Sequence, residues 1–295
     1  MRIVIIDDYS RSVRSLRAFE LVKNDEVTVL HEPITTPEGW RQYLAQAQAL
    51  VLIRERSVID AAVLDQAPNL RIVSCAGALA GTLDLEACNA RRIAVAQSRG
   101  TGHATAELCW GMILASERRL PQQIDSLRNG QWQGAIGRQL HGRRLGLWGF
   151  GKIAQQVAQY GRAFGMDVWV WGRDSSLERA RAAGWTCAPD SEAFLSQSDI
   201  VSVQLKLNAQ TRHLITAADL MRMKPDAPFV NTSRAGLVAP GALEAALDAG
   251  RPGAAAIDVF EDEPVTDIRH PLISRPNVRS EEHTSELQSR FGISY

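Results

Sequence analysis

A glycine-rich segment in the middle of the chain constrains the fold more than any other feature. Residues 145–154 read Leu-Gly-Leu-Trp-Gly-Phe-Gly-Lys-Ile-Ala, and from Gly149 onward they follow a G-x-G-x-x-A pattern. An apolar run, residues 145–148, precedes these glycines, and an amphipathic stretch, residues 153–164, follows them. A second apolar run at residues 168–171 closes a unit of about 30 residues. This order predicts a strand, a tight turn, a helix and a second strand, as in dinucleotide-binding folds.

The small residues of this segment each have a physical role in the predicted turn. Gly149 permits the tight turn, Gly151 lets the backbone approach a pyrophosphate, and Ala154 lets the helix pack closely on the sheet. The first N–H groups of the helix and the positive end of its dipole then attract the phosphates. The predicted cofactor-binding residues of this turn are Gly149, Phe150, Gly151, Lys152 and Ile153. The alternative is an ordinary tight turn between a strand and a helix.

Short apolar runs rich in Val and Ile recur along the chain. They lie at residues 2–6, 27–30, 50–53, 71–74, 200–205, 228–231 and 254–259. Amphipathic stretches of helical length lie between many of them, such as residues 241–249. Strands that are apolar throughout are buried on both faces, and their alternation with helices is typical of parallel sheets. The sequence therefore predicts the α/β fold class.

The length and the charge balance of the chain limit its partners. Its 295 residues are enough for two domains of ordinary size. Lys and Arg together number 33, as do Asp and Glu, so no basic field favours nucleic acid or an anionic membrane. No apolar run approaches the roughly 20 residues that span a bilayer. The N-terminal segment is too short and too soon acidic for a signal peptide, so we expect a cytoplasmic protein.

The four cysteines give no sign of a metal site. Cys75, Cys88, Cys109 and Cys187 lie far apart, without a Cys-x-x-Cys pair or a histidine at zinc-binding spacing. We expect reduced thiols that behave as small hydrophobic residues, as is usual in the cytosol. No metal is predicted.

A domain boundary is predicted between residues 98 and 99. The segment 97–102 is polar and contains glycine, and a long helix is expected after it, from about Ala104 to Gly130. This helix carries four large apolar side chains, Trp110, Met112, Ile113 and Leu114. They could face a second subunit or pack inside the domain, and the sequence leaves both interpretations open.

The end of the strand at residues 168–171 bears on the choice between NAD and NADP. A site selective for NAD usually has Asp or Glu about 20 residues after the glycines, where it bonds the ribose 2′-OH. Here Gly172 occupies that place and Arg173 follows it. No carboxylate would repel a 2′-phosphate, and the guanidinium is able to bind one, which slightly favours NADP over NAD. The alternative is that Arg173 is solvated and that Asp174 turns inward.

Several further blocks resemble the D-isomer-specific 2-hydroxyacid dehydrogenase family in their order and spacing. They lie at residues 105–108, 198–203, 211–215, 223–225, 230–236 and 256–264, and the resemblance extends over residues 1–278. It implies two doubly wound, Rossmann-like domains with parallel sheets. A dinucleotide-binding domain, residues 99–278, is then inserted into a substrate domain that begins with residues 1–98. Ligands are expected at the carboxyl ends of the parallel strands.

The resemblance also implies roles for individual residues. Arg234 holds the substrate carboxylate and polarises the carbonyl, which suits a planar guanidinium that binds a carboxylate through two hydrogen bonds. Glu263 pairs with the catalytic histidine and favours its charged form, with Glu261 and Asp262 as alternative acidic neighbours. Backbone N–H groups of a loop at Gly77 and Ala78 also hold the substrate. The remaining cofactor contacts are Thr105, Arg173, Leu205, Thr232 and Asp258.

The family's catalytic histidine lies in a Thr-Pro-His-Ile-Gly block that is absent here. After Val278 the chain is polar and charged, and residues 279–289 resemble the translation of a sequencing adapter. We therefore expect residues 279–295 to be a non-native tail that replaces the returning segment of the substrate domain. The activity of such a truncated chain is expected to be impaired. His283 keeps the family's spacing from Val278 and is the candidate acid. His270 is the other nearby candidate, although its turn is usually structural in relatives.

The resemblance implies an oxidoreductase that transfers a hydride between NAD(P)H and a small 2-keto or D-2-hydroxy acid. Glyoxylate, hydroxypyruvate and a phosphorylated serine precursor are the candidate substrates. Because family members are commonly dimers, a homodimer is expected as well. The alternative is a non-catalytic NAD(H)-binding regulator of the same fold, since a fold does not fix a function.

Overall fold

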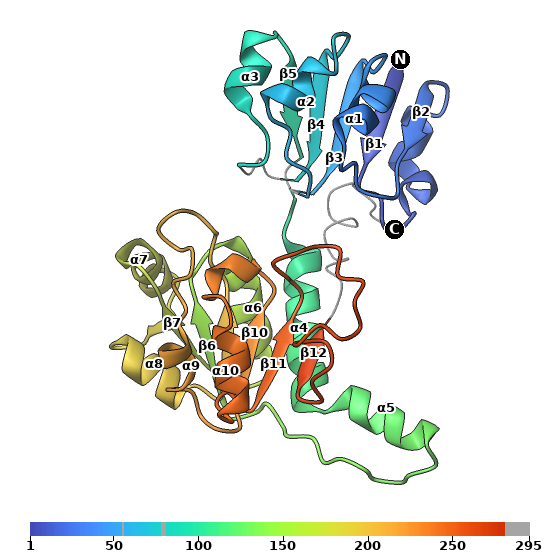
Figure 1. Cartoon of the computed structure of the whole chain (residues 1–295). Coiled ribbons are helices and arrows are strands. Elements are labelled where there is room, and N and C mark those ends of the chain that lie inside the picture. Colours follow the sequence, from blue (N-terminus) through green and yellow to red (C-terminus); the bar gives the residue numbers. More distant parts are fainter. Residues whose placement is uncertain (55, 78–80, 99, 281–295) are drawn as a thin grey trace. The chain divides into compact units, whose positions relative to one another are not determined.

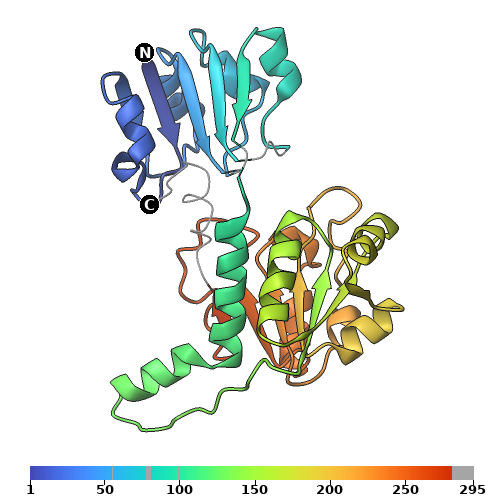
Figure 2. The same cartoon turned by 180° about the vertical axis from the view of Figure 1, so that it is seen from behind.

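The computed structural model describes residues 1–54, 56–77, 81–98 and 100–280 (Figures 1 and 2). The chain divides into two compact units, of which the first comprises Met1–Thr101 and the second begins at Gly102. The division falls inside the polar segment 97–102, where a boundary is predicted. The insertion of one domain into the other stays a prediction.

The first unit is built on a parallel sheet with the strand order β2-β1-β3-β4-β5. Its strands are β1 (Arg2–Ile6), β2 (Glu26–Val29), β3 (Ala49–Ile53), β4 (Ile72–Ala76) and β5 (Ala94–Gln97). Its helices are α1 (Pro37–Leu44), α2 (Ala61–Asp65) and α3 (Leu85–Ala90), with 3-10 turns η1 (Val13–Ser15) and η2 (Arg17–Leu21). The strand order reverses between β1 and β3, which makes this a doubly wound sheet.

The central strands β1 and β3 of this sheet are buried on both faces, which explains why they are almost entirely apolar. In β1, Ile3 and Ile5 pack into one cluster of buried side chains, whereas Val4 and Ile6 pack into another. Successive side chains of a strand point to opposite faces, so a strand covered on both sides needs apolar residues at every position.

The second unit has a larger parallel sheet with the strand order β12-β11-β10-β9-β6-β7-β8. Its strands are β6 (Arg144–Trp148), β7 (Asp167–Trp171), β8 (Thr186–Cys187), β9 (Ile200–Val203), β10 (Pro228–Asn231), β11 (Ala254–Ile257) and β12 (Val278–Ser280). Its helices are α4 (His103–Glu117), α5 (Leu120–Arg128), α6 (Lys152–Ala163), α7 (Asp174–Ala182), α8 (Ser191–Gln197), α9 (Ala217–Leu220) and α10 (Ala242–Asp248), with a 3-10 turn η3 (Ala235–Leu237). The order reverses between β6 and β9, so the prediction of an α/β fold with two doubly wound parallel sheets is confirmed.

Helix α6 lies against the sheet as the glycine pattern predicts. Its buried residues Ala154, Val157, Ala158 and Gly161 form one stripe at positions i, i+3, i+4 and i+7. A Cβ at Gly161 would lie only 2.9 Å from Cδ2 of Leu145 in β6, so the helix backbone approaches the strand closely. The small residues of this face therefore set the distance between helix and sheet.

The single long helix predicted for residues 104–130 is wrong, because two helices occupy this region. Helix α4 ends at Glu117 and α5 begins at Leu120, and Arg119 between them has the left-handed conformation with φ 51°. Pro121 explains the break, since it has no N–H to donate to the carbonyl of Glu117 four residues earlier. That carbonyl accepts the amide of Arg138 instead, at 2.7 Å.

The large side chains of α4 pack inside the second unit. Trp110, Met112 and Ile113 are buried in one apolar cluster, and Leu114 packs partly against it. The ring of Trp110 meets Phe164 edge-on, with 5.0 Å between ring centroids. Internal packing thus accounts for these side chains, and a contact of α4 with a second subunit stays a prediction.

The apolar pattern misses three strands, β5, β8 and β12, and all three lie at sheet edges. An edge strand is paired on one side only and needs fewer apolar residues, so its sequence signal is weak. In β12, Arg279 lies opposite Ala256 of β11. The polar segment that we expect to be non-native therefore starts within a strand. None of the helices in the described ranges is long and apolar enough to cross a membrane.

Candidate active site

The carboxyl ends of neighbouring strands bring several predicted cofactor residues into one row. The last residues of β6, β9, β10 and β11 lie opposite one another in register, and they are Trp148, Val203, Asn231 and Ile257. The residues that directly follow them are Gly149, Gln204, Thr232 and Asp258. These four positions therefore emerge side by side at the sheet edge where doubly wound folds bind their ligands.

The two glycines of the turn after β6 differ in what surrounds them. Gly149 has φ +104°, its amide donates to the Trp171 carbonyl at 2.7 Å, and a Cβ here would lie 2.6 Å from the carbonyl oxygen of Gln204. Gly151 caps the start of α6 in an extended conformation, and a Cβ at this position would meet nothing within 4 Å. Gly149 is therefore required by the fold, whereas Gly151 leaves open space at a helix N-terminus, which fits a pyrophosphate.

The other predicted residues near this turn divide into buried and exposed ones. Phe150 is 1% exposed, so only its backbone is able to face a cofactor. Its carbonyl accepts Nε of Arg179 at 3.3 Å, which brings a guanidinium to the turn. Lys152 is exposed, Ile153 is half-buried, and Thr105 of α4 is buried.

The residues after β7 occupy the place predicted to select the cofactor. A Cβ at Gly172 would lie 3.6 Å from Cα of Gly149, so any side chain at this position would stand against the glycine turn. Arg173 follows at the start of α7, and its Nη1 donates to Oε1 of Gln210 at 3.2 Å. Gly172 has no carboxylate that would bond a ribose 2′-OH, and the next residue, Arg173, carries a guanidinium.

Thr232 and Asp258 lie at the end of the row, next to a polar cluster that the sequence does not predict. Both are nearly fully buried, at 3% and 1% exposure. Nε2 of Gln204 donates to Oγ of Ser202 at 2.9 Å and to Sγ of Cys109 at 3.4 Å. Burial raises the pKa of the Cys109 thiol, which keeps it protonated. Since α4 and β9 are far apart in the sequence, no local pattern could have revealed this cluster.

Arg234 lies in a loop that Asn231 holds in shape. The side chain of Asn231 accepts the Ser233 amide at 3.0 Å and donates to the Arg234 carbonyl at 3.1 Å. Ser233 also donates from Oγ to the Val203 carbonyl at 2.8 Å, which ties the loop to β9. The preference of Asn for such turns could have predicted this role. Arg234 thus lies in the loop after β10, at the same edge of the sheet as the predicted cofactor residues.

Glu263 lies in the loop after the neighbouring strand, β11. Its Oε1 accepts the amide of Phe260 at 3.1 Å, which fixes the carboxylate in a tight turn. The ring of Phe260 packs edge-on against His270, with centroids 5.3 Å apart. His270 accepts the amide of Leu272 at Nδ1, at 3.2 Å, as part of a local turn.

The predicted substrate loop belongs to the first unit. Gly77 follows β4 with φ +145°, and its amide donates to the Cys75 carbonyl at 2.8 Å. Ala78 and His283 lie outside the described residues. Leu205 is half-buried beside the glycine turn, where its Cδ2 would lie 3.0 Å from a Cβ at Gly149.

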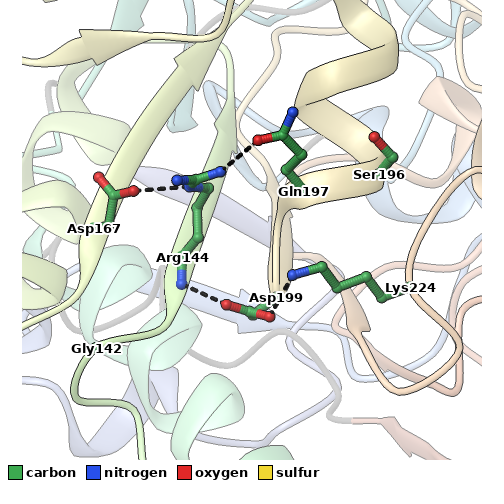
Figure 3. Close-up of a pocket in the computed structure, with 7 residues that line it drawn as sticks. All are labelled: Gly142, Arg144, Asp167, Ser196, Gln197, Asp199 and Lys224. Atoms are coloured by element: carbon green, nitrogen blue, oxygen red, sulfur yellow. Dashed lines mark hydrogen bonds and ion pairs between the residues drawn. The ribbon is translucent and has the colours of Figure 1, made fainter.

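A polar cavity of about 320 Å³ lies at the opposite, amino-terminal edge of the second sheet (Figure 3). Arg144 reaches Asp167 at 2.8 Å and Gln197 at 2.9 Å, and its guanidinium stacks 3.7 Å from the centroid of the Trp169 ring. The seven residues that line the cavity are Gly142, Arg144, Asp167, Ser196, Gln197, Asp199 and Lys224. These charged side chains already pair with one another, so their role is structural: they hold together the N-terminal ends of the neighbouring strands.

No cluster of metal-binding side chains occurs in the described part of the chain. The fold and the row at the sheet edge define a dinucleotide-binding protein of the doubly wound class. Comparisons with known proteins then identify its family. The model of the D-isomer-specific 2-hydroxyacid dehydrogenase NAD-binding domain matches residues 110–285.

Two relatives and one solved structure agree with this match. A glyoxylate reductase of Aeropyrum pernix is 38% identical over 244 residues, which cover 79% of this chain and 72% of that protein. A hydroxypyruvate reductase of Thermotoga maritima is 32% identical over 281 residues, which cover 92% and 90%. The structure of a phosphoglycerate oxidoreductase from Vibrio cholerae superposes with a TM-score of 0.91 at 40% identity, covering 99% of this chain and 96% of that one.

The chain belongs to the D-isomer-specific 2-hydroxyacid dehydrogenase family. It is therefore an oxidoreductase of 2-hydroxy acids that uses a nicotinamide dinucleotide, as the resemblance implies. These relatives are named as enzymes, so the interpretation as a non-catalytic regulator gains no support from them.

Proposed function

We propose that this protein reduces a small 2-keto acid with NADPH at the carboxyl edge of the second sheet. One observation carries the proposal. The glycine turn, Thr232 and Asp258 follow neighbouring strands in register, and Arg234 follows two residues after Thr232. The edge of the sheet thus carries the N-terminus of α6 for the phosphates, the buried Thr232 and Asp258, and the guanidinium of Arg234. A dinucleotide bound along this edge would place its nicotinamide near the substrate.

The residues of this chain have distinct roles in the proposed reaction. The N-terminus of α6 and the Gly151 backbone bind the pyrophosphate, and the buried Thr232 and Asp258 fix the carboxamide. Arg234 clamps the substrate carboxylate and polarises the carbonyl, while Glu263 orients the histidine that gives a proton to the new hydroxyl group. His283, the candidate for that histidine, lies outside the described residues. The nicotinamide, when bound, supplies the hydride.

The preference for NADPH over NADH rests on Gly172 and Arg173. A side chain at Gly172 would face the glycine turn, and none is there to repel a 2′-phosphate. Arg179 donates to the Phe150 carbonyl of the turn, and Arg173 follows Gly172 directly and donates to Gln210. Planar guanidinium groups bind phosphate through paired hydrogen bonds, which makes them suited to a 2′-phosphate.

The substrate candidates follow from the relatives. One is named as a glyoxylate reductase and another as a hydroxypyruvate reductase, so we propose these two 2-keto acids as substrates of this chain. We also propose that the protein acts in the cytoplasm and as a homodimer.

Steady-state kinetics with NADPH and NADH, with glyoxylate and hydroxypyruvate as substrates, test this proposal. We expect Arg234→Gln to lower kcat/KM about 100–1,000-fold while NADPH binding is retained, because the carboxylate and the developing charge lose their cation. Arg251→Gln, an exposed arginine after α10, is the matched control. Equal losses in both variants, or unchanged activity in Arg234→Gln, would refute the role of Arg234.

The cofactor and the acid are tested separately. Arg173→Ala is expected to lower kcat/KM for NADPH about tenfold and to leave that for NADH unchanged. A version whose residues 281–285 read Thr-Pro-His-Ile-Gly keeps His283 in place. A higher kcat in that version than in the original chain would support His283 as the acid. If His283→Ala made in that version left its kcat unchanged, the role of His283 would be contradicted.

A further inference from the structure

Gln204, the residue directly after β9, turns its side chain back onto the face of the sheet that α4 covers. Alternate residues of a strand point to the same side, so Gln204 continues the side of β9 that holds Ile200 and Ser202. Helix α4 packs on this face beside α6 (Figure 2). Cys109 of α4 lies against Ser202, with 3.4 Å between Sγ and Oγ.

The amide group of Gln204 is held by these two side chains. Its Nε2 donates to Oγ of Ser202 at 2.9 Å and to Sγ of Cys109 at 3.4 Å. Ser202 and Cys109 are both 0% exposed, so water does not compete for these bonds. A side-chain amide has two N–H donors and one acceptor oxygen, and both donors are engaged here. Oε1 of Gln204 is therefore the atom that remains to bind a ligand.

The backbone of Gln204 is fixed on both sides as well. Its amide donates to the Trp148 carbonyl at 2.8 Å, and its carbonyl oxygen lies 2.6 Å from the position of a Cβ at Gly149. On the other side, Oγ of Ser233 donates to the carbonyl of Val203, the residue before Gln204, at 2.8 Å. Gln204 is thus held between the glycine turn and the loop after β10.

The place of Gln204 in the row at the sheet edge indicates what it binds. The strand order β6, β9, β10, β11 puts the residues that follow these strands in the order Gly149, Gln204, Thr232 and Asp258. The proposed function assigns the pyrophosphate to the glycine turn and the carboxamide to Thr232 and Asp258. In a nicotinamide dinucleotide, the unit between these two groups is a ribose. Its hydroxyl groups are donors, which match the acceptor oxygen of an amide.

We propose that Gln204 binds the ribose on the nicotinamide side of the cofactor, with Oε1 accepting a hydrogen bond from a ribose hydroxyl group. Ser202 and Cys109 are positioning residues, because they act by holding the amide of Gln204. This inference rests on the proposed function and adds to it a contact between the pyrophosphate site and the carboxamide site. That contact fixes where the nicotinamide lies along the sheet edge.

Binding titrations with ADP-ribose and ADP test the contact, because these ligands differ only by the ribose in question. The same pair with a 2′-phosphate on the adenosine serves for an NADP site. Gln204→Leu keeps the size of the side chain and removes its hydrogen-bonding groups. We expect this variant to bind ADP-ribose about tenfold more weakly and ADP as the wild type does. An equal loss for both ligands, or no loss for either, overturns the proposal.

A double-mutant cycle tests the positioning role of Ser202. Ser202→Ala is expected to weaken ADP-ribose binding about threefold in the wild type and to have no further effect in Gln204→Leu, because it acts only through Gln204. Ser198→Ala is the matched control, since Ser198 is also 0% exposed but donates to the Phe194 carbonyl at 2.6 Å. The same threefold loss in both backgrounds refutes the positioning role.

Titration of the wild type with NADPH and NADH separates a failure of this contact from a failure of the proposed function. A wild type that binds neither cofactor overturns the proposed function, and the ribose contact with it. A wild type that binds either cofactor, with ADP-ribose affinity unchanged in Gln204→Leu, overturns the ribose contact alone.

Discussion

Alanine substitutions at the two glycines of the β6–α6 turn are expected to have opposite effects on stability and binding. Gly149→Ala places a methyl group 2.6 Å from the Gln204 carbonyl oxygen, in a residue with φ +104°. A left-handed conformation costs about 1–2 kcal/mol for a residue with a Cβ, and overpacking against backbone costs about 1–3 kcal/mol more. We expect a loss of about 3 kcal/mol, which lowers the Tm of the second unit by roughly 6–12 °C.

Gly151→Ala should leave the fold intact and damage cofactor binding. A Cβ at Gly151 meets nothing within 4 Å, and its extended backbone, with φ −92°, is accessible to alanine. The substitution restricts the unfolded chain, so stability stays the same or rises by up to about 1 kcal/mol. The added methyl group lies where the backbone should approach the pyrophosphate, so NADPH affinity is expected to fall at least tenfold, or about 1.4 kcal/mol.

Thermal melts and NADPH titrations of both variants measure these effects. An unchanged Tm in Gly149→Ala would show that the backbone of Gln204 yields and that the close approach is not required. Wild-type NADPH affinity in Gly151→Ala would place the pyrophosphate elsewhere and would refute the assignment of the helix N-terminus as its site.

Two further predictions concern ionisation. Burial and the neighbouring Asp7 carboxylate raise the pKa of Tyr9 to about 12 from its usual 10.0, so its contribution to stability is present below pH 10 and is lost as the pH rises through 12. Because Tyr9 is only half-buried, solvent screens part of this effect. Urea unfolding between those pH values should therefore show a fall of about 1 kcal/mol in the wild type that is absent in Tyr9→Phe, and parallel curves would contradict this. Burial opposes ionisation of Asp199, but hydrogen bonds from the Arg144 amide and the Lys224 ammonium outweigh burial and lower the pKa of its carboxyl. The stability that the Asp199 carboxylate contributes is therefore present above pH 3.8 and is lost as the pH falls through the lowered pKa. Lys224→Met should lower the free energy of unfolding at pH 7 by less than about 1 kcal/mol, with the difference closing below pH 4, and a difference that persists in acid would exclude the ion pair as its cause.

The strands buried in the middle of each sheet were predictable because their signal is local. The run that forms β1 is apolar on both faces, which is typical of a parallel strand that is covered on both sides. The turn at Gly149 was predictable for the same reason, since a tight turn and a close helix require small residues at fixed spacing. The break before α5 could have been foreseen from Pro121, whereas the edge strands β5, β8 and β12 have only four, two and three residues, which is too short for a clear pattern.

The sequence by itself determined the fold class, the glycine turn and the residue types available for chemistry, because those depend on neighbours within about ten residues. Tertiary structure alone decided which of these residues meet. Register across β6, β9, β10 and β11 aligns Gly149 with Thr232 and Asp258. The buried carboxylate of Glu117, at the end of α4, meets the guanidinium of Arg138, which lies 21 residues further along the chain. The physical reason is that register and burial are settled by the packing of entire elements, which no local pattern of side chains encodes.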